Sequence, residues 1–198
     1  MAQSGTLLHV AFVTDGSASH PHHSIVSPKE VADLRQSEAR LAMGILGVDW
    51  SRVTFLGAPD GALAQLSGEP LERLVDAIAA LLLKLVPQAI FLPCQRDGSS
   101  EHDAAFLLLC HALGRSGLRP RIFEFPVWSW WNPILLIKSM FGYRKVWSVD
   151  LGETRGLKAR AAASYVSQTL PIPPDKTSAL PPGFASMFLG GEEFLLER

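Results

Sequence analysis

The sequence predicts an α/β fold, specifically a Rossmann-like three-layer sandwich whose sheet is mostly parallel and covered by helices on both faces. Strand-like segments alternate along the chain with helix-like segments. The strand-like segments are continuously apolar, which is typical of parallel strands that are buried on both faces. The chain has 198 residues, which is enough for one substantial core, and we therefore expect a single domain over residues 1–198.

The first strand and the first helix have clear signals. Leu7–Thr14 is a run of apolar and β-branched residues that ends in an Asp-Gly turn. Ser27, Pro28 and Glu30 have the spacing of an N-cap, a proline at the first helical position and a capping box. The apolar face that follows predicts a helix that stops near Gly47.

The remaining elements follow in alternation, because apolar runs are separated by prolines, glycines and helix-cap residues. In chain order, we expect a strand at 53–57, a helix at 70–86, a strand at 89–93, a helix at 101–115, strands at 121–128 and 145–151, a helix at 153–170, a proline-rich loop at 171–183 and an edge strand near the C-terminus.

Composition excludes several classes of protein. With 18 basic and 19 acidic residues, the formal net charge is -1, and no basic patch indicates a nucleic-acid partner. Cys94 and Cys110 lie in apolar surroundings and are expected to be reduced core residues, which favours a cytoplasmic protein. No signal peptide is visible at the start of the sequence.

We expect no integral membrane span. The longest apolar candidate, residues 127–147, is interrupted by Pro133, Lys138 and Arg144 before it reaches the roughly 20 apolar residues that cross a bilayer. This tryptophan-rich segment could lie at a membrane interface. Folding over the rim of an active site is the use that we favour for it.

Three polar clusters follow three predicted strands, and they contain the candidate site residues. The clusters are "TDGSASHPHH", "LGAPDG" and "PCQRDGSSEHD". Ligands of parallel sheets bind beyond the carboxyl ends of the strands. We therefore expect Asp15, Asp60 and His102 to line one crevice.

Each candidate also has a simpler interpretation. His102 could bind zinc, oriented by a neighbouring carboxylate, or it could be a surface histidine in an acidic first turn of a helix. Asp15 and Asp60 could contact a substrate or only cap their turns. Arg35 could donate to a polar ligand or lie on a solvated helix surface. The residues alone leave these alternatives open.

The histidines of "SHPHHS", His20, His22 and His23, raise a similar question. They could form a second metal cluster, but a histidine-rich loop that binds metal adventitiously is the interpretation that we favour. Cys94 has no activating partner nearby in the sequence, so a nucleophilic cysteine is not expected.

Taken together, four blocks resemble the PIG-L/LmbE-like family of zinc-dependent deacetylases. They are "VTDGSASHP", "RQSEARLAMGILGV", "VTFLGAPDG" and "RDGSSEHDAA". Their order and spacing carry the resemblance, which continues through "FEFPVW", "KARAAASYVSQ" and "EEFLLER". The resemblance implies that the protein removes an acetyl group from N-acetylglucosamine-like conjugates. Its expected partner is therefore a small-molecule sugar conjugate. A homo-oligomer is the assembly that we consider for the chain.

The fourth block is similar to the family's His-Pro-Asp-His motif. The resemblance implies that His102 is a metal ligand and that Asp97 is the catalytic residue that orients this motif. Ser99 stands where the family has a histidine expected to stabilise the transition state, and Glu101 stands in place of the aspartate. Asp15, Arg35 and Asp60 match positions that are expected to bind the substrate.

The family's other motif, Ala-His-Pro-Asp-Asp, supplies two metal ligands and the general base, and it does not occur in this sequence. We therefore expect an N-terminally incomplete domain, a metal-dependent hydrolase by descent, with zinc as its cofactor in doubt. Three accounts remain open: a start placed too late, a homologue that binds a sugar conjugate without cleaving it, or an interaction subunit. Zinc activation of a water beside a carboxylate base is the mechanism of an intact relative.

Overall fold

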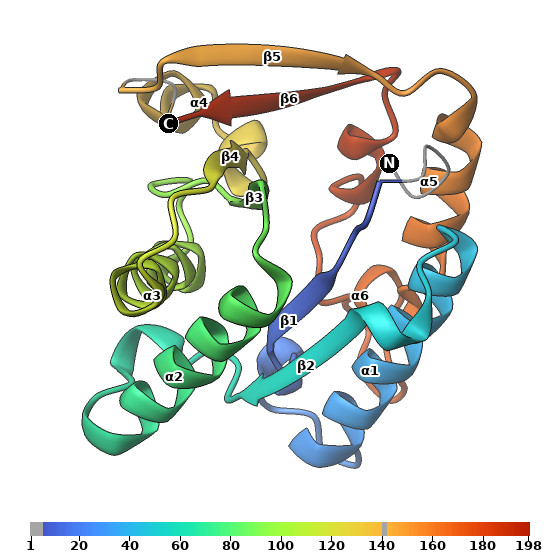
Figure 1. Cartoon of the computed structure of the whole chain (residues 1–198). Helices are drawn as coiled ribbons and strands as arrows, with labels where there is room; N and C mark the ends of the chain where they lie inside the picture. The colour runs from blue at the N-terminus through green and yellow to red at the C-terminus, as the bar shows by residue number, and fades with distance from the viewer. Residues whose placement is uncertain (1–5, 140–141) are drawn as a thin grey trace. The chain divides into compact units, whose positions relative to one another are not determined.

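The protein is described by a computed structural model that covers residues 6–139 and 142–198. The chain divides into two compact units (Figure 1). Unit 1 comprises Met1–Gly61 and Leu151–Gly191, and unit 2 comprises Ala62–Asp150 and Glu192–Arg198. Each unit contains a sheet and helices, so the predicted α/β class is confirmed.

Unit 1 is built on a two-stranded parallel sheet. Its elements are β1 (Val10–Thr14), α1 (Pro28–Ile45), β2 (Val53–Ala58), α5 (Arg155–Ala163) and α6 (Val166–Thr169), with short 3-10 turns at Ser17–Ser19, Trp50–Arg52, Gly152–Thr154 and Ala185–Phe188. Phe12 of β1 is in register with Phe55 of β2, and their rings stack with centroids 5.0 Å apart. The parallel pairing of these two strands agrees with the sequence prediction.

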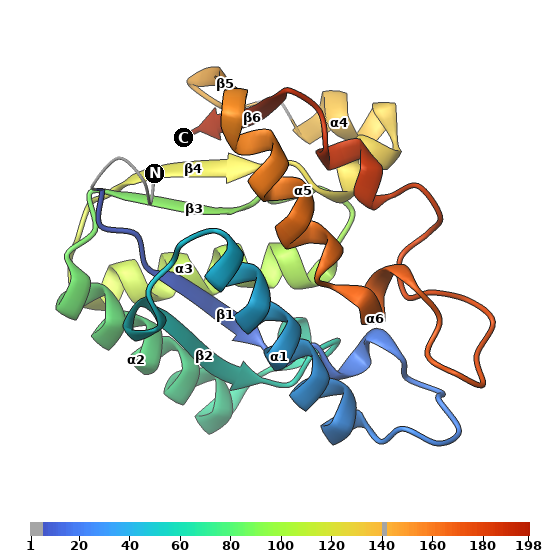
Figure 2. The ribbon, with the colours of Figure 1, turned by 90° about the vertical axis from the view of Figure 1, so that its right-hand side faces the viewer.

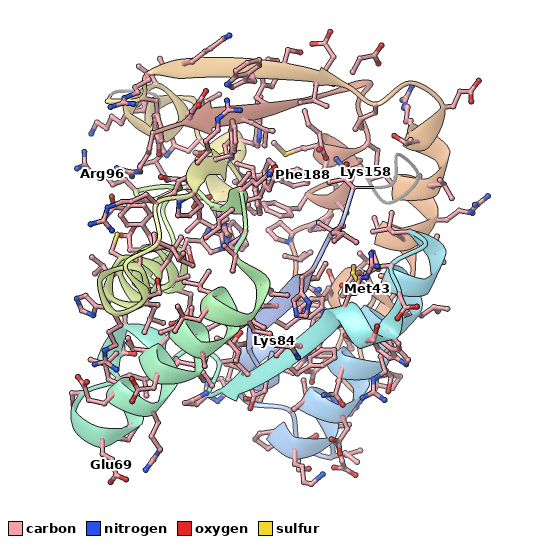
Figure 3. All side chains as sticks on the ribbon, viewed as in Figure 1. Met43, Glu69, Lys84, Arg96, Lys158 and Phe188 are labelled. Carbon is pink, nitrogen blue, oxygen red and sulfur yellow. The ribbon has the colours of Figure 1, made fainter. Side chains whose placement is uncertain are left out.

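Helix α1 begins as the sequence predicts and contributes to the core of unit 1. Ser27 Oγ accepts from the backbone N–H of Glu30, and the Glu30 side chain accepts from the backbone N–H of Ser27, which completes the capping box. Ala42 and Met43 of α1 pack with Ala161 of α5, and Val10, Phe12 and Val53 are among the residues that surround them. Figure 2 shows α1 and α5, and Met43 is labelled in Figure 3.

Unit 2 has a four-stranded sheet with the order β3-β4-β6-β5. Its elements are α2 (Gly68–Leu85), β3 (Ala89–Pro93), α3 (Ser100–Ser116), β4 (Arg121–Phe125), α4 (Pro133–Ser139), β5 (Lys145–Asp150) and β6 (Glu192–Glu197), with 3-10 turns at Leu63–Gln65 and Trp128–Trp131. Strands β3 and β4 are parallel, whereas β6 is antiparallel to both of its neighbours.

Three details of unit 2 differ from the sequence prediction. Strand β3 pairs with β4 instead of joining β1 and β2 in one sheet. The predicted C-terminal edge strand, β6, is not at an edge. It lies inside the sheet and pairs with β4 on one side and with β5 on the other (Figure 1). Helix α4 was not predicted, although Asn132 followed by Pro133 is a helix-start signal, and Asn132 Oδ1 accepts from the N–H of Ile134 at 3.0 Å.

The predicted helix at 153–170 is broken in the structure. Helix α5 ends at Ala163, and α6 starts at Val166. Between them, Ser164 Oγ donates to the backbone C=O of Ala161 at 2.6 Å. The break allows Ser167 to turn its backbone N–H and its hydroxyl toward Glu38 of α1. A tertiary contact has therefore overridden a local helical pattern.

Both cysteines are free thiols, as expected. Cys94 is buried, but Cys110 is exposed and is therefore not the core residue that its apolar neighbours predicted. Within residues 6–139 and 142–198, no helix is both long enough and apolar enough to cross a membrane.

Candidate functional site

The loop that follows β3 holds a fully buried carboxylate. Asp97 has no exposed surface. Its Oδ2 accepts from the backbone N–H groups of Val127 at 2.9 Å and Trp128 at 3.1 Å, just after β4. The carboxylate therefore holds two loops of unit 2 together, and its position and orientation are fixed by the backbone.

His102 lies beside this carboxylate. Its Nδ1 is 3.2 Å from Asp97 Oδ1, and its side chain is 19% exposed. Ser99 caps α3 by accepting from the His102 N–H at 3.4 Å, which places the imidazole in the first turn of the helix. The two atoms are close enough for an ion pair but do not meet the geometry of a hydrogen bond, and neither has a hydrogen-bond partner among the described residues. The carboxylate therefore lies on the Nδ1 side of the ring, and Nε2 is the nitrogen left for another partner.

The other acidic side chains of this cluster serve as anchors. Glu101 Oε1 accepts from the Leu63 N–H at 3.1 Å, and Asp103 Oδ1 accepts from the Arg96 N–H at 2.6 Å. Arg96 itself points outward (Figure 3) and has a left-handed backbone with φ 65°. Glu101 Oε2 is buried and has no hydrogen-bond partner among the described residues.

The segment after β4 covers this loop. Gly98 has φ +94°, and a Cβ placed on it would lie 3.0 Å from Leu135 Cδ1 of α4 and 4.0 Å from Trp128 Cβ. A larger residue at position 98 would therefore be strained in its backbone and would push against α4. The expectation that the tryptophan-rich segment folds over a rim stays a prediction, but within unit 2 this segment does pack on the loop between Asp97 and His102.

A second buried carboxylate, Glu124 of β4, was not anticipated from the sequence. It accepts from the Gln95 N–H at 2.7 Å and the Tyr143 hydroxyl at 2.7 Å, and it pairs with Arg198. Burial, together with the hydrogen bond to Glu124, raises the pKa of Tyr143. Burial also raises the pKa of Cys94 to about 12, so the thiol stays protonated at neutral pH and is not a nucleophile. This network is structural.

In unit 1, Asp15 and Asp60 tie two loops together reciprocally. Asp15 Oδ1 accepts from the N–H groups of Ser17 at 3.0 Å and Asp60 at 3.2 Å, and Asp60 Oδ2 accepts from the Ala18 N–H at 3.2 Å. Both carboxylates therefore cap turns, which is the simpler of the two interpretations. The arrangement does not use all of their lone pairs, so a ligand contact remains compatible with it.

Arg35 of α1 lies against the same loops, and its side chain is only 18% exposed. A Cβ on Gly16 would lie 3.1 Å from Arg35 Nε, and the guanidinium carbon lies 5.3 Å from the centroid of the Tyr165 ring. Burial lowers the pKa of Arg35, while the charges of Glu38, Tyr165 and Asp60 oppose that shift. Arg35 Nε is buried without a hydrogen-bond partner in the described part of the chain. The solvated-surface interpretation of Arg35 is therefore wrong.

Glu38 is a residue of this region that the sequence reasoning missed. Glu38 is 7% exposed, and its Oε2 lies 3.5 Å from Arg35 Nη1. Its carboxylate also accepts two hydrogen bonds from Ser167, one from the backbone N–H and one from the hydroxyl, each at 2.7 Å. Its spacing of three from Arg35 on a helix was the available signal. Its partner Ser167 lies 129 residues away and gave no signal.

The histidine loop is not a chelating cluster. His23 Nδ1 accepts from the Val26 N–H at 2.8 Å, so Nε2 carries the proton and donates to the Ile172 C=O at 3.1 Å. His20 is 7% exposed, with Nδ1 beside Ser19 Oγ at 3.2 Å. Only His22 of the three is exposed.

The predicted site residues thus form two groups. Asp15, Arg35 and Asp60 come together in unit 1, and Asp97 and His102 come together in unit 2. The expectation that Asp15, Asp60 and His102 line one crevice stays a prediction, because these residues belong to different units. Two open pockets of about 330 Å³ lie elsewhere in unit 1, and these five residues are not among those that line them.

The described residues do not fit a catalytic zinc. Such a site normally uses three protein ligands, and no three His, Cys, Asp or Glu side chains among residues 6–139 and 142–198 converge on a metal position. Glu101 is committed to the Leu63 N–H, and Asp97 contacts the ring nitrogen of His102 that faces away from an Nε2-bound metal. His102 is therefore at most one ligand.

Comparisons with solved structures show the same fold in several enzymes. The A40926 pseudoaglycone deacetylase Dbv21 is 18% identical, with a TM-score of 0.65 over 98% of this chain and 86% of its own. N,N'-diacetylchitobiose deacetylase from Pyrococcus horikoshii is 16% identical, with a TM-score of 0.63, and the match covers 100% of this chain and 74% of the deacetylase. GalB, the 4-carboxy-2-hydroxymuconate hydratase from Pseudomonas putida KT2440, is also 16% identical, with a TM-score of 0.65, and the match covers 99% of this chain and 85% of the hydratase.

A hydratase among these structures means that the fold does not select the chemistry. A search of curated protein sequences found no match. The family assignment rests instead on a family model, described as GlcNAc-PI de-N-acetylase, which matches residues 1–113 and therefore more than half of the chain. Those residues include both the Asp15–Arg35–Asp60 group and the Asp97–His102 pair. The chain belongs to the PIG-L family.

Proposed function

We propose that this protein is a deacetylase-type domain that recognises an N-acetylglucosamine-like conjugate through Asp15, Arg35 and Asp60. The observation that carries the proposal is the buried Arg35, whose Nε lacks a partner while its side chain packs on the loop of Asp15. A buried guanidinium donor without an acceptor is costly, and a ligand hydroxyl or carbonyl would satisfy it. Carboxylates that cap neighbouring turns supply acceptors for sugar hydroxyls.

Hydrolysis is a separate part of the proposal. His102 is proposed as one metal ligand, with Asp97 as the residue that positions its ring. Because the donor set does not fit a catalytic zinc, we expect the chain to bind the conjugate without releasing acetate. A complete metal-dependent deacetylase is the second candidate function, favoured by family membership and by the Asp97–His102 pair.

Binding is tested by calorimetry with an alkyl N-acetylglucosaminide. We expect Arg35→Gln and Asp60→Asn to weaken binding, by roughly 10- to 150-fold each, because each removes a charge-assisted hydrogen bond worth about 1.5–3 kcal/mol. The matched control is Asp33→Asn, on the exposed side of the same helix. A folded chain that does not bind the glycoside, or binding that is insensitive to both changes, would refute the proposed recognition site.

Turnover is tested by measuring primary-amine release from the same glycoside with zinc added. No release above background is expected. Release that disappears in His102→Ala would establish the second candidate function and reject binding without turnover.

A further inference from the structure

The segment that follows β1 fixes two of the proposed ligand groups of unit 1. We call residues 15–20 the β1 turn. The N–H of Ser17 donates to Asp15 Oδ1 at 3.0 Å, and the N–H of Ala18 donates to Asp60 Oδ2 at 3.2 Å. Because both carboxylates accept from the backbone of the β1 turn, their positions depend on its conformation.

His20 anchors the C-terminal end of the β1 turn through Ser19. Ser19 Oγ donates to the Gly16 C=O at 3.0 Å and lies 3.2 Å from His20 Nδ1. A hydroxyl has one proton to donate, so the contact with the ring is satisfied when Nδ1 carries the proton and donates to Oγ. The neutral ring with its proton on Nδ1 therefore completes a chain of hydrogen bonds from His20 to the backbone of Gly16.

Gly16 also lies against Arg35, the third of the proposed ligand residues. A Cβ on Gly16 would lie 3.1 Å from Arg35 Nε and 3.2 Å from its Cγ, and Gly16 has a left-handed backbone with φ 74°. One residue of the β1 turn is thus packed on Arg35 and is connected to His20 by hydrogen bonds. A displacement of the β1 turn would therefore change the contact with Arg35 and the positions of both carboxylates.

The surroundings of His20 suit an uncharged ring. His20 is 7% exposed, and its Nε2 has no hydrogen-bond partner among the described residues. A proton on Nε2 would bury both a charge and an N–H without an acceptor, and each is costly. The nearby charges have both signs: His23 and Arg35 oppose protonation of the ring. Asp175 and Glu38 favour it, but burial is the largest cause and lowers the pKa of His20.

We propose that His20 is a positioning residue of this site, and that the β1 turn holds Asp15 and Asp60 in place for a sugar conjugate only while the imidazole is uncharged. The inference rests on the proposed recognition of such a conjugate by Asp15, Arg35 and Asp60. Protonation of the buried ring favours a displaced β1 turn in which the ring reaches water, whereas the conjugate binds the undisplaced turn. Proton and conjugate therefore oppose each other's binding.

The test is calorimetry of the full chain with an alkyl N-acetylglucosaminide, in steps of about half a pH unit from about pH 7.5 to about pH 5.0. This range ends above about pH 4, near which unperturbed carboxylates titrate. We expect the affinity to fall as the pH drops, by at least about threefold in total. The slope should not exceed about tenfold per pH unit, which is the limit for one proton.

Two changes at His20 separate positioning by a neutral ring from a purely structural role. His20→Asn keeps an amide N–H that can donate to Ser19 Oγ but does not titrate. It should bind within about twofold of the unchanged chain at about pH 7.5 and lose the pH dependence. His20→Ala removes the anchor, so it should bind roughly three- to tenfold more weakly at every pH. The matched control is His22→Gln, an exposed histidine of the same loop, which should keep the pH dependence.

Far-UV circular dichroism at each pH shows which samples are folded, and the unchanged chain and His20→Asn are sufficient for the decision. A pH dependence that persists in His20→Asn, or an affinity of the unchanged chain that does not vary with pH, would overturn the role of His20. Loss of the pH dependence in His22→Gln would do the same. Failure of the proposed function gives a different result, in which the unchanged chain does not bind the glycoside at about pH 7.5 or Arg35→Gln has no effect there, and that result would overturn both proposals.

Discussion

His20 and His102 are both histidines in polar clusters that follow strands, yet their surroundings differ. His102 has the Asp97 carboxylate 3.2 Å from its Nδ1. His20 is buried with only the Ser19 hydroxyl beside its Nδ1, and its Nε2 has no partner among the described residues. Burial is the largest cause of a lowered pKa for His20; His23 and Arg35 add to the shift, whereas Asp175 and Glu38 oppose it. The neutral form of His20 is thus the one that suits the fold.

This difference predicts an acid sensitivity of folding. The pKa of His20 is lower in the folded chain than in the unfolded chain, where it is about 6.5. As the pH drops below about 6.5, the unfolded state binds the proton before the folded state does. The free energy of unfolding therefore falls between about pH 6.5 and the pKa of His20 in the folded chain. Above about pH 6.5, His20 does not change the free energy of unfolding. His20→Gln should reduce the loss of stability, measured by urea unfolding at about pH 7.5 and about pH 5.5.

The matched control is His22→Gln in the same loop, because His22 is exposed. We expect it to leave the acid-induced loss of stability as it is in the unchanged chain. If His20→Gln and His22→Gln gave the same pH dependence as the unchanged chain, the buried imidazole would not be the group responsible.

At the scale of elements, the contact between α1 and α6 is the one that local sequence could not predict. Glu38 is buried on α1, and its carboxylate accepts the Ser167 N–H and hydroxyl at the start of α6. Hydrogen bonds to a buried charge contribute about 1.5–3 kcal/mol to stability. Glu38→Ala should therefore lower the free energy of unfolding by at least that much, measured by urea denaturation.

A double-mutant cycle with Ser167→Ala separates this contact from other effects of the change. A coupling energy of roughly 0.5–3 kcal/mol is expected between residues that share hydrogen bonds. The control is Asp33→Ala on the same helix, whose partner Lys29 is exposed, and it should change stability little. Strictly additive effects of Glu38→Ala and Ser167→Ala would mean that the two side chains do not stabilise the fold through each other.

The elements that the sequence predicted are those whose signals are local. The capping box at Ser27 and Glu30 set the start of α1, and apolar runs set β1 and β2 to within a few residues. The break before α6 depends on Glu38, and the place of β6 inside its sheet depends on pairing with strands distant in the chain. Such contacts leave no periodic pattern in their own segment, so sequence reasoning could not reach them.

The candidate site shows the same division. The resemblance to the family implied the roles of Asp97 and His102, while the residues alone left a simpler interpretation of His102 open, and the structure places His102 Nδ1 3.2 Å from Asp97 Oδ1. The resemblance to the family indicated Arg35, but its contact with Tyr165 joins α1 to the segment between α5 and α6, which is far away in the chain. Glu124 looked like an ordinary strand residue, and its burial became visible only with Tyr143 and Arg198 in place.

For the molecule as a whole, family membership and donor chemistry lead to different expectations. The PIG-L family model matches residues 1–113, and its description names a de-N-acetylase. The described residues of this chain nevertheless bring together no three metal-binding side chains. Family membership supports a deacetylase-type function, whereas the donor set of the described residues does not fit a catalytic zinc, and metal binding is the property that tests one against the other.

Zinc titration of the purified chain by calorimetry tests this separation. His102 offers one imidazole nitrogen, while Asp97 contacts its other nitrogen and Glu101 accepts the Leu63 N–H, so one protein ligand is expected where a catalytic zinc normally has three. Zinc binding should therefore be weak, and His102→Ala should change it little. His22→Ala is the control for adventitious binding by an exposed imidazole. Stoichiometric zinc binding that His102→Ala abolishes, and that His22→Ala leaves intact, would show that further residues complete a metal site around His102.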